Sequence, residues 1–440
     1  MPAADHAPDG SGSQGAAAPD GLQVAPFRGV RYVPARVSDL AAVTSPPYDV
    51  IDPDDATHLE QLDPHNVVRL ILPRDPRGGA AGVGPGRYAH AAELLDGWRA
   101  EGILRRDPRP ALYVYEQSGP GVFQRGLLAA VGLHDPADRV VLPHEDVMPG
   151  PVADRLELMR ATGANLEPIL LVYDGGGDTA AVLDEVAAGP PTLETTAEDG
   201  LTQRVWVVED PALHERVARD LAPRQALIAD GHHRWATYRR LQAERHAAGR
   251  GAGPWDRGLA MLVDSRTSPL RVAAIHRVVA DLDLVTALAA AGEIFTVGPA
   301  GDDLESALSV LRETAGAHPF VVTDGETYRL LTDPDPAAVE AALPPERPAR
   351  WRSLDASVLH LLLLERLWQV SDDARRVGYL HDSRSAVRAA RRAHGVAVLM
   401  RPVTVSDVLA LAAEGERMPR KSTSFGPKPR TGLVLRVLDD

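Results

Sequence analysis

The chain has 440 residues, of which 44% are hydrophobic and 25% are charged, so it is long enough for two or three globular domains. It contains no cysteine, which excludes disulfides, thiolate nucleophiles, Cys-ligated zinc and iron–sulfur clusters. The formal net charge of −14 argues against a nucleic-acid partner and against docking on an anionic membrane, because both need a basic surface.

Residues 1–22 are rich in Ala, Pro, Gly and Asp and have neither a basic start nor an apolar core, so we expect a disordered leader and no targeting signal. No stretch approaches 18 uninterrupted apolar residues, so we expect no membrane span and a cytoplasmic location. We expect an N-terminal α/β region over residues 23–280 and a C-terminal α/β region over residues 281–440.

Hydrophobic periodicity predicts strands and helices in alternation along the chain. Strands are predicted at residues 24–33, 43–51, 66–73, 110–117, 123–133, 166–173, 204–208, 258–263, 270–279, 320–322, 328–331, 396–401 and 431–438. Helices are predicted at residues 88–101, 179–188, 211–221, 356–368 and 405–413. This alternation predicts an α/β fold of mixed (α+β) character.

A proline-stiffened loop follows the second predicted strand. In residues 45–49 (Ser-Pro-Pro-Tyr-Asp), two prolines fix the backbone and hold Tyr48 and Asp49 in one direction, which suits the wall of a binding site. A structural turn with a packed tyrosine is the alternative. Arg69, inside the apolar run 66–73, needs a partner if it is buried, and either a ligand anion or an ordinary ion pair would serve.

The second polar cluster begins with His144 and Glu145 and continues with Asp154, Arg155 and Asn165. A His-Glu pair could supply a general base or bind a metal-bound water, and a solvated loop is the alternative. The spacing is not His-Glu-x-x-His, which disfavours a zinc protease.

The richest motif lies at residues 226–241, where a short apolar run stops at Asp230 and Gly231 and a helical pattern follows. This order predicts a strand, a tight turn and a helix N-terminus. Free backbone N–H groups and the helix dipole favour an anion there, and Gly231 would let the backbone approach it closely. A solvated turn with adjacent histidines is the alternative.

Both lysines of the chain, Lys421 and Lys428, lie in one short segment near the C-terminus, around Ser422 and Thr423. Elsewhere the chain uses arginine for its basic side chains. Paired lysines beside hydroxyl groups therefore indicate a need for compact ammonium charges, as at phosphates, with a basic surface turn as the alternative.

These motifs occur in a fixed order. The series is Ser-Pro-Pro-Tyr-Asp-Val-Ile (45–51), His-Asn-Val-Val-Arg-Leu (65–70), His-Glu (144–145), Asp-Arg (154–155), Ala-Asp-Gly-His-His-Arg (229–234) and Lys-Ser-Thr (421–423). It resembles the bacterial and archaeal family described as domain of unknown function 1015, from about residue 26 to the end. The family usually has Lys-Ser-Thr-Tyr-Phe-x-Pro-Lys, whereas this chain has Ser424 and Gly426, so we expect its last loop to have lost an aromatic contact.

The turn at residues 228–236 is also similar to the phosphate-binding turn of the ParB and sulfiredoxin superfamily. Some members of that superfamily are free L-serine kinases with an Asp-Gly-His-His-Arg version of this turn. The resemblance implies a ParB/sulfiredoxin-like nucleotide-binding core within a larger two-part α/β chain, whose final Lys-Ser-Thr loop returns to the site. It further implies that Gly231, His232, His233 and Arg234 contact nucleotide phosphates.

The preferred interpretation is an ATP-dependent small-molecule kinase that uses Mg²⁺, with free L-serine as the acceptor and O-phosphoserine as the product. We expect Glu145 to act as the base, with Asp230 and Asp49 behind it, and His232 to help neutralise charge. The remaining predicted ligands of the phosphates or of the small polar substrate are Lys421, Ser422, Thr423, Lys428, Tyr48, Arg69, His144 and Asn165. No residue is assigned as a ligand of a resident metal, and a homodimer is a candidate assembly.

Two other classes stay open. The same turn could bind CTP or ATP in a switch or adaptor protein that has no small-molecule acceptor. A metal hydrolase could instead be built from His144, Glu145, His232 and His233. All site hypotheses require Asp49, Glu145, residues 232–234 and Lys421 to line one cleft.

Overall fold

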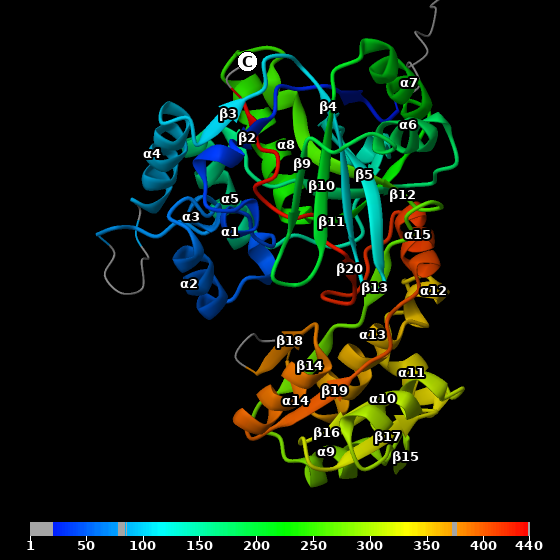
Figure 1. Cartoon of the computed structure of the whole chain (residues 1–440). Helices are drawn as coiled ribbons and strands as arrows, with labels where there is room; N and C mark the ends of the chain where they lie inside the picture. The colour runs from blue at the N-terminus through cyan, green and yellow to red at the C-terminus, as the bar shows by residue number, and fades with distance from the viewer. Residues whose placement is uncertain (1–20, 78–83, 85, 372–375, 439–440) are drawn as a thin grey trace, which may run out of the picture.

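The computed structural model describes residues 21–77, 84, 86–371 and 376–438. Apart from its last two residues, the leader predicted over residues 1–22 lies outside these. Figure 1 shows a larger upper body and a smaller lower lobe, with the last segment of the chain running back from the lobe into the body. The mixed α/β fold predicted from the alternation is confirmed.

The upper body is built on a nine-stranded mixed sheet with the order β6-β11-β8-β12-β5-β4-β10-β9, in which β1 also pairs with β5. Its strands are β1 (Val24–Ala25), β4 (Leu112–Gly119), β5 (Val122–Gly132), β6 (Val141–Leu142), β8 (Ile169–Tyr173), β9 (Leu193–Thr196), β10 (Thr202–Val208), β11 (Ala226–Asp230) and β12 (Arg257–Asp264). Strand β11 pairs parallel with β6 and antiparallel with β8, so it lies inside the sheet near one edge.

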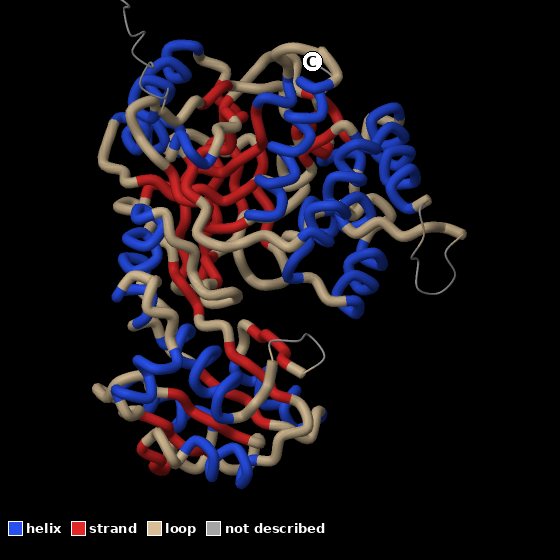
Figure 2. The backbone as a smooth tube through the Cα atoms, turned by 180° about the vertical axis from the view of Figure 1, so that it is seen from behind, coloured by secondary structure: helices blue, strands red, loops and turns tan. Residues whose placement is uncertain are grey.

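The central strands are apolar on both faces, which explains why helices cover both sides (Figure 2). Along β8, Leu170 and Val172 belong to one hydrophobic core, whereas Ile169 and Leu171 belong to the other. Alternate side chains of a strand point to opposite faces, so a continuous apolar run is the pattern of a strand covered on both. One core includes residues of α6 (Asp178–Ala187), α7 (Pro211–Leu221) and α8 (His232–Ala247). The other includes residues of α1 (Leu40–Val43), α3 (Val68–Ile71) and α4 (Arg87–Ala100).

The helices of the upper body surround this sheet. They are α1 (Leu40–Val43), α2 (Pro53–Leu62), α3 (Val68–Ile71), α4 (Arg87–Ala100), α5 (Pro149–Thr162), α6 (Asp178–Ala187), α7 (Pro211–Leu221) and α8 (His232–Ala247). Helix α8 packs against α5, β8 and β12, which fixes the direction of its N-terminus.

The lower lobe holds an antiparallel six-stranded sheet with the order β15-β17-β16-β19-β14-β18. Its strands are β14 (His276–Val279), β15 (Thr296–Pro299), β16 (Phe320–Thr323), β17 (Tyr328–Thr332), β18 (Val377–Leu380) and β19 (Val396–Leu399). The helical segments after β14 are α9 (Leu284–Ala291), α10 (Leu304–Glu313), α11 (Pro336–Ala342), α12 (Ala349–Arg352), α13 (Asp355–Val358), η6 (Leu359–Leu367), α14 (Ser383–Arg392) and α15 (Val405–Glu414).

After α15 the chain returns to the upper body through a series of short pairings (Figure 1). Strand β20 (Ser424–Gly426) pairs with β13 (Arg271–Ala273), and Thr431 bridges to Ser45. Strand β21 (Arg436–Val437) then pairs with β7 (Ala164–Asn165). A two-stranded sheet of β2 (Val30–Tyr32) and β3 (Leu104–Arg106) completes the body. These pairings bring residues 421–428 beside elements that are more than 150 residues earlier in the chain.

Several predicted elements match closely, since α4, α6, α7 and α15 begin and end within a residue or so of the predictions. The predicted strand at residues 66–73 is wrong, because the segment forms the helical turn α3. The side chain of Asn66, just before this turn, accepts a hydrogen bond from the N–H of Val68, and Pro73 follows the end of the turn. A short apolar run that is buried all round has no period by which strand and helix could be told apart.

Four other strands differ from the prediction. Residues 24–33 split into β1 and β2, which belong to different sheets. Residues 43–51 hold the end of α1 and the single turn η2 (Tyr48–Val50), residues 270–279 split into β13 and β14 of different sheets, and residues 431–438 keep only β21. In each case proline, glycine or a bend between lobes interrupts a stretch whose side chains are nonetheless apolar. Among the described residues, no helix is long and apolar enough to cross a membrane.

Candidate functional site

The turn between β11 and α8 has the predicted strand–turn–helix geometry. Strand β11 ends at Asp230, Gly231 has a φ of +93°, and α8 begins at His232. That φ lies in the left-handed region, which glycine adopts without steric cost. Among the described residues, no side chain caps the N-terminus of α8, so its first backbone N–H groups stay available to a ligand.

A cavity of about 190 Å³ opens at this turn, and we call it the turn cavity. Most of the predicted site residues line it, namely Tyr48, Asp49, Glu145, Asp230, Gly231, His232, His233, Arg234, Lys421, Thr423 and Lys428. They come from the loop before α2, the loop after β6, the β11–α8 turn and the returning C-terminal segment. The structure therefore brings together the residues that every site hypothesis required to meet.

Arg234 braces the turn. Its Nη2 donates to Asp230 Oδ2 at 2.5 Å and its Nη1 donates to the carbonyl oxygen of Pro168 at 2.6 Å. Burial opposes its charge, but the carboxylates of Glu167 and Asp230 outweigh that effect and raise the pKa of Arg234. Both terminal nitrogens are thus engaged by protein oxygens, and the guanidinium holds the strand end and the first helical turn in register.

Lys428 joins two carboxylates. Its Nζ lies 2.7 Å from Asp49 Oδ2 and 2.7 Å from Asp230 Oδ1. Burial alone would lower the pKa of Lys428, but these carboxylates raise it, and its ammonium in turn holds the pKa of Asp49 below the ordinary value despite burial. Lys428 therefore ties the Pro-Pro-Tyr-Asp loop to the end of β11.

Lys421 differs from Lys428, because it has no ion pair within the described part of the chain although it lines the same cavity. Its backbone has a φ of +53°, and its N–H donates to Glu145 Oε1 at 3.5 Å. The charge of Lys421 also contributes to the lowered pKa of His233, after the larger effect of burial. Lys421 is thus a cation at the cavity without a direct ion pair among the described residues, although its charge acts on the carboxylate of Glu145.

The two histidines of the turn are neutral hydrogen-bonding groups. His232 Nε2 accepts from the N–H of His144 at 3.3 Å, and His233 Nε2 accepts from the N–H of Met148 at 3.0 Å. Burial lowers the pKa of both rings, that of His232 far below the ordinary value. With Nε2 accepting, the ring proton of each neutral imidazole belongs on Nδ1, which leaves an N–H donor.

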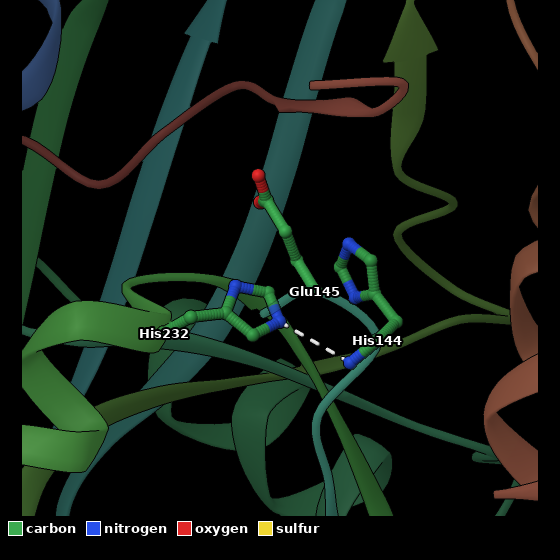
Figure 3. Close-up of side chains that lie close together, drawn as sticks. All are labelled: His144, Glu145 and His232. Carbon is green, nitrogen blue, oxygen red and sulfur yellow. Dashed lines mark hydrogen bonds between the residues drawn. The ribbon is translucent and has the colours of Figure 1, made fainter. Parts of the chain in front are cut away.

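His144, Glu145 and His232 form a compact group (Figure 3), with one ligand atom from each lying within 4.8 Å of the others. The His144 and His232 rings meet edge to face at 4.5 Å, and His144 Nε2 lies 2.9 Å from Thr423 Oγ1. Burial lowers the pKa of His144 to about 3 and raises the pKa of Glu145 above 4.5. Two neutral imidazoles and a carboxylate are suitable ligands for a transition metal, but ligands on one zinc ion lie only about 2 Å from it, so this group would have to contract.

Some predicted site residues lie elsewhere. Arg69 Nη2 donates to the carbonyl oxygen of Glu60, and Asn165 Oδ1 accepts from the N–H of Leu259 and from Arg436, so neither faces the turn cavity. Ser422 is buried and donates to the carbonyl oxygen of Pro419. These three side chains support the fold around the site.

Three further residues that shape this site are not among those predicted from the sequence. Glu167 is 4% exposed and accepts from the N–H of Tyr48 at 2.9 Å, which anchors the Pro-Pro-Tyr-Asp loop. His381 reaches the turn cavity from the end of β18 in the lower lobe. Phe425 packs on the His144 ring at a centroid distance of 5.3 Å, so the returning segment keeps one aromatic contact beside Ser424. A polar residue just before an apolar strand was the available signal for Glu167; His381 had none.

The fold and this cavity define a mixed α/β protein with an anion-favouring turn at its centre. The sequence matches the family described as protein of unknown function (DUF1015) over residues 24–357, and the chain belongs to that family. No curated protein matches the chain.

Solved structures show a remote likeness. A free serine kinase variant in complex with AMP is similar at a TM-score of 0.35 and 15% identity, over 70% of this chain and 92% of the other. A conserved hypothetical protein from Pyrococcus furiosus gives 0.35 and 15%, over 71% and 95%. SbnI with a C-terminal truncation, from Staphylococcus aureus, gives 0.36 and 13%, over 71% and 90%. Likeness at these scores does not extend to function.

Proposed function

We propose that this protein is a nucleotide-dependent phosphotransferase that moves the terminal phosphoryl group of ATP to the hydroxyl group of a small molecule, with free L-serine as the first acceptor to test. One observation carries the proposal. The uncapped N-terminus of α8, the ammonium of Lys421, which has no ion pair among the described residues, and the carboxylate of Glu145 line the same cavity. Phosphoryl transfer requires mainly positioning and charge neutralisation, which this combination supplies.

The phosphates occupy the turn. Backbone N–H groups at the start of α8 and the dipole of a 16-residue helix attract an anion. Lys421 adds a full positive charge, and the Nδ1–H groups of His232 and His233 add neutral donors. Arg234 and Lys428 are already paired with carboxylates, so they contribute rigidity more than attraction.

Glu145 is the general base. Burial raises its pKa, which brings the carboxyl group closer to the operating pH that suits proton transfer. Asp49 and Asp230 are held by Lys428, and an ammonium at 2.7 Å makes a carboxylate a weaker base. Glu145 has no ion pair among the described residues, and burial raises its pKa more than the charge of Lys421 lowers it, so it accepts the proton of the acceptor hydroxyl.

The chemistry of the cavity also fits Mg²⁺, which binds through one or two carboxylates together with substrate phosphates. Glu145, Asp49 and Asp230 offer oxygen ligands at the cavity wall. When bound, the ion would neutralise phosphate charge, and the orientation of the phosphates would still depend on the α8 turn.

The test is direct. Purified protein is incubated with L-serine and ATP, ADP or CTP, and O-phosphoserine is measured together with the nucleotide product. Nucleotide-dependent phosphoserine formation that is lost in Glu145→Gln supports the proposal. Absence of any phosphorylated acceptor across the three nucleotides would sink it.

The same experiment separates the alternatives. Slow nucleotide hydrolysis that no acceptor accelerates would favour a nucleotide-dependent switch. The His144, Glu145 and His232 group favours the metal hydrolase as a second candidate, and a stoichiometric transition metal that copurifies with the protein and is lost in His144→Ala would support it.

A further inference from the structure

A second cavity, of about 690 Å³, adjoins the turn cavity, and we call it the side cavity. The two share Asp49, Lys421 and Lys428 as a common wall. The rest of the side cavity is lined by the Pro-Pro-Tyr-Asp loop, by strands of the large sheet, and by β18 of the lower lobe. Its volume is in the range of cavities that hold a whole small molecule, whereas the turn cavity has room for little more than phosphate groups.

Arg430 gives the side cavity a guanidinium that has no ion pair among the described residues. Its Nε donates to Thr44 Oγ1 at 2.7 Å, and its Nη2 donates to the carbonyl oxygens of Thr44 and Ala41 at 3.0 and 3.3 Å. Within the described part of the chain, Nη1 has no hydrogen-bond partner and no carboxylate lies within ion-pair distance. Three neutral acceptors thus fix the guanidinium and leave its charge and one terminal nitrogen available.

The carboxylates of the side cavity are occupied elsewhere. Asp49 pairs with Lys428, Asp52 accepts from the N–H groups at the start of α2, and Asp199 Oδ1 accepts from the N–H of Leu201. None of them forms an ion pair with Arg430; burial lowers the pKa of Arg430 and outweighs the charge of Asp199, which acts on it only from beyond ion-pair distance. A partly buried guanidinium beside a cavity is best matched by an anion with two oxygens, since its fork binds a carboxylate through parallel hydrogen bonds.

Because the two cavities share a wall, a molecule in the side cavity can extend a hydroxyl group toward the phosphates at the α8 turn. We propose that the side cavity binds the phosphoryl acceptor, that this acceptor is an alcohol that carries a carboxylate, and that Arg430 holds the carboxylate. This rests on the phosphotransferase function proposed above. In the transfer, the acceptor oxygen forms the new bond to phosphorus, the bond between that phosphorus and the leaving nucleotide oxygen breaks, and the hydroxyl proton passes to Glu145.

Binding is tested first, without turnover. Three carboxylate-bearing alcohols (L-serine, L-homoserine and 6-hydroxyhexanoate) and their neutral carboxamides are titrated calorimetrically into the full chain. At least one carboxylate should bind, and its affinity should fall about 10- to 100-fold in Arg430→Gln and for its own carboxamide, as for a lost charge-assisted hydrogen-bonded pair. Arg430→Lys keeps the charge and should recover part of that loss.

Arg436→Gln is the matched control. Arg436 is also a buried arginine held by neutral oxygens, those of Asn165, Arg257 and Pro254, but it lines neither cavity. Binding that falls equally in both glutamine variants, or no binding of any of the three carboxylates, would overturn the inference. The kinetic comparison separates the two proposals: transfer to neutral alcohols alone would leave the phosphotransferase standing and remove the role of Arg430. Carboxylate binding that depends on Arg430 but leads to no phosphoryl transfer would keep the role of Arg430 in binding and refute the phosphotransferase function.

Discussion

Replacing Lys428 by methionine removes the ammonium that lies between Asp49 and Asp230. Methionine fills a similar volume with no charge, so the substitution changes electrostatics more than packing. The side chain of Lys428 is 17% exposed and that of Asp230 is 10% exposed, so water replaces little of the lost interaction on the Asp230 side. The expected result is a less stable protein at neutral pH.

The size of the stability loss is estimated for the two carboxylate partners, Asp49 and Asp230, separately. Asp49 is 34% exposed, and an ion pair screened by water in this way contributes about 0–1 kcal/mol. Breaking a buried pair costs about 3–5 kcal/mol when it leaves a charge without compensation. Asp230 keeps its bond to Arg234, however, so part of that compensation remains. We therefore expect Lys428→Met to lower the free energy of unfolding by about 2–4 kcal/mol.

The pKa shifts of Lys428 and Asp49 determine how this stability loss changes with pH. The pKa of Lys428 is raised and that of Asp49 is lowered, so the stabilisation is present above the ordinary carboxylate pKa of about 4 and below the ordinary lysine pKa of about 10.5. The loss in Lys428→Met should be full near pH 7 and should shrink as the pH falls below about 4 toward the lowered pKa of Asp49, because Asp49 then binds a proton. Urea unfolding followed by tryptophan fluorescence at several pH values measures it. A destabilisation that stays constant from pH 7 to pH 3 would refute the electrostatic explanation.

The other predictions concern the cavity itself. Lys421→Met should weaken nucleotide binding about 10- to 100-fold. It should change the free energy of unfolding by less than about 0.5 kcal/mol, because Lys421 has no ion pair among the described residues. Equal loss of stability in Lys421→Met and Lys428→Met would contradict this. Gly231→Ala should cost about 1–3 kcal/mol, since φ is +93° and the new Cβ would lie 3.2 Å from the guanidinium of Arg234; an unchanged unfolding midpoint would argue against the turn geometry. Glu145→Gln should lower kcat about 10²- to 10⁴-fold. In the wild type the rate should rise with pH through a pKa above 4.5, and the variant should lack this acidic limb of the pH–rate profile. A variant that keeps the limb would show that another residue is the base.

The turn at residues 226–234 could be predicted from the sequence because all of its signals are local. An apolar run, an Asp-Gly stop and a helical pattern lie within one short stretch, and the left-handed φ of Gly231 agrees with that pattern. The two lysines could be singled out because they are rare in this chain, yet their different surroundings could not be foreseen. Whether a lysine is paired depends on which carboxylates the fold places beside it.

The missed residues depend on tertiary contacts. Arg430 is fixed by Thr44 and Ala41, which lie almost 390 residues earlier in the chain, and His381 arrives from the other lobe. No spacing rule connects such positions. The misassigned turn at residues 66–73 has a different cause, because an apolar run buried on all sides has no period that separates strand from helix; the local hydrogen bond from the N–H of Val68 to Asn66 agrees with the turn.

The acidity of the chain raises the question of how an anionic nucleotide could be held. A net charge of −14 repels anions at long range, but at physiological ionic strength charges more than about 8 Å away are largely screened. Only the cavity wall then matters, and there the protein has already cancelled most of its own charges: Arg234 and Lys428 neutralise Asp230 and Asp49. The charged groups left at the cavity wall are then Lys421 and the α8 N-terminus, which are positive, and Glu145, which is negative. A short anion needs only that residual field, whereas a nucleic acid would extend across many screening lengths of acidic surface. This charge distribution therefore fits the proposed nucleotide ligand better than a polynucleotide.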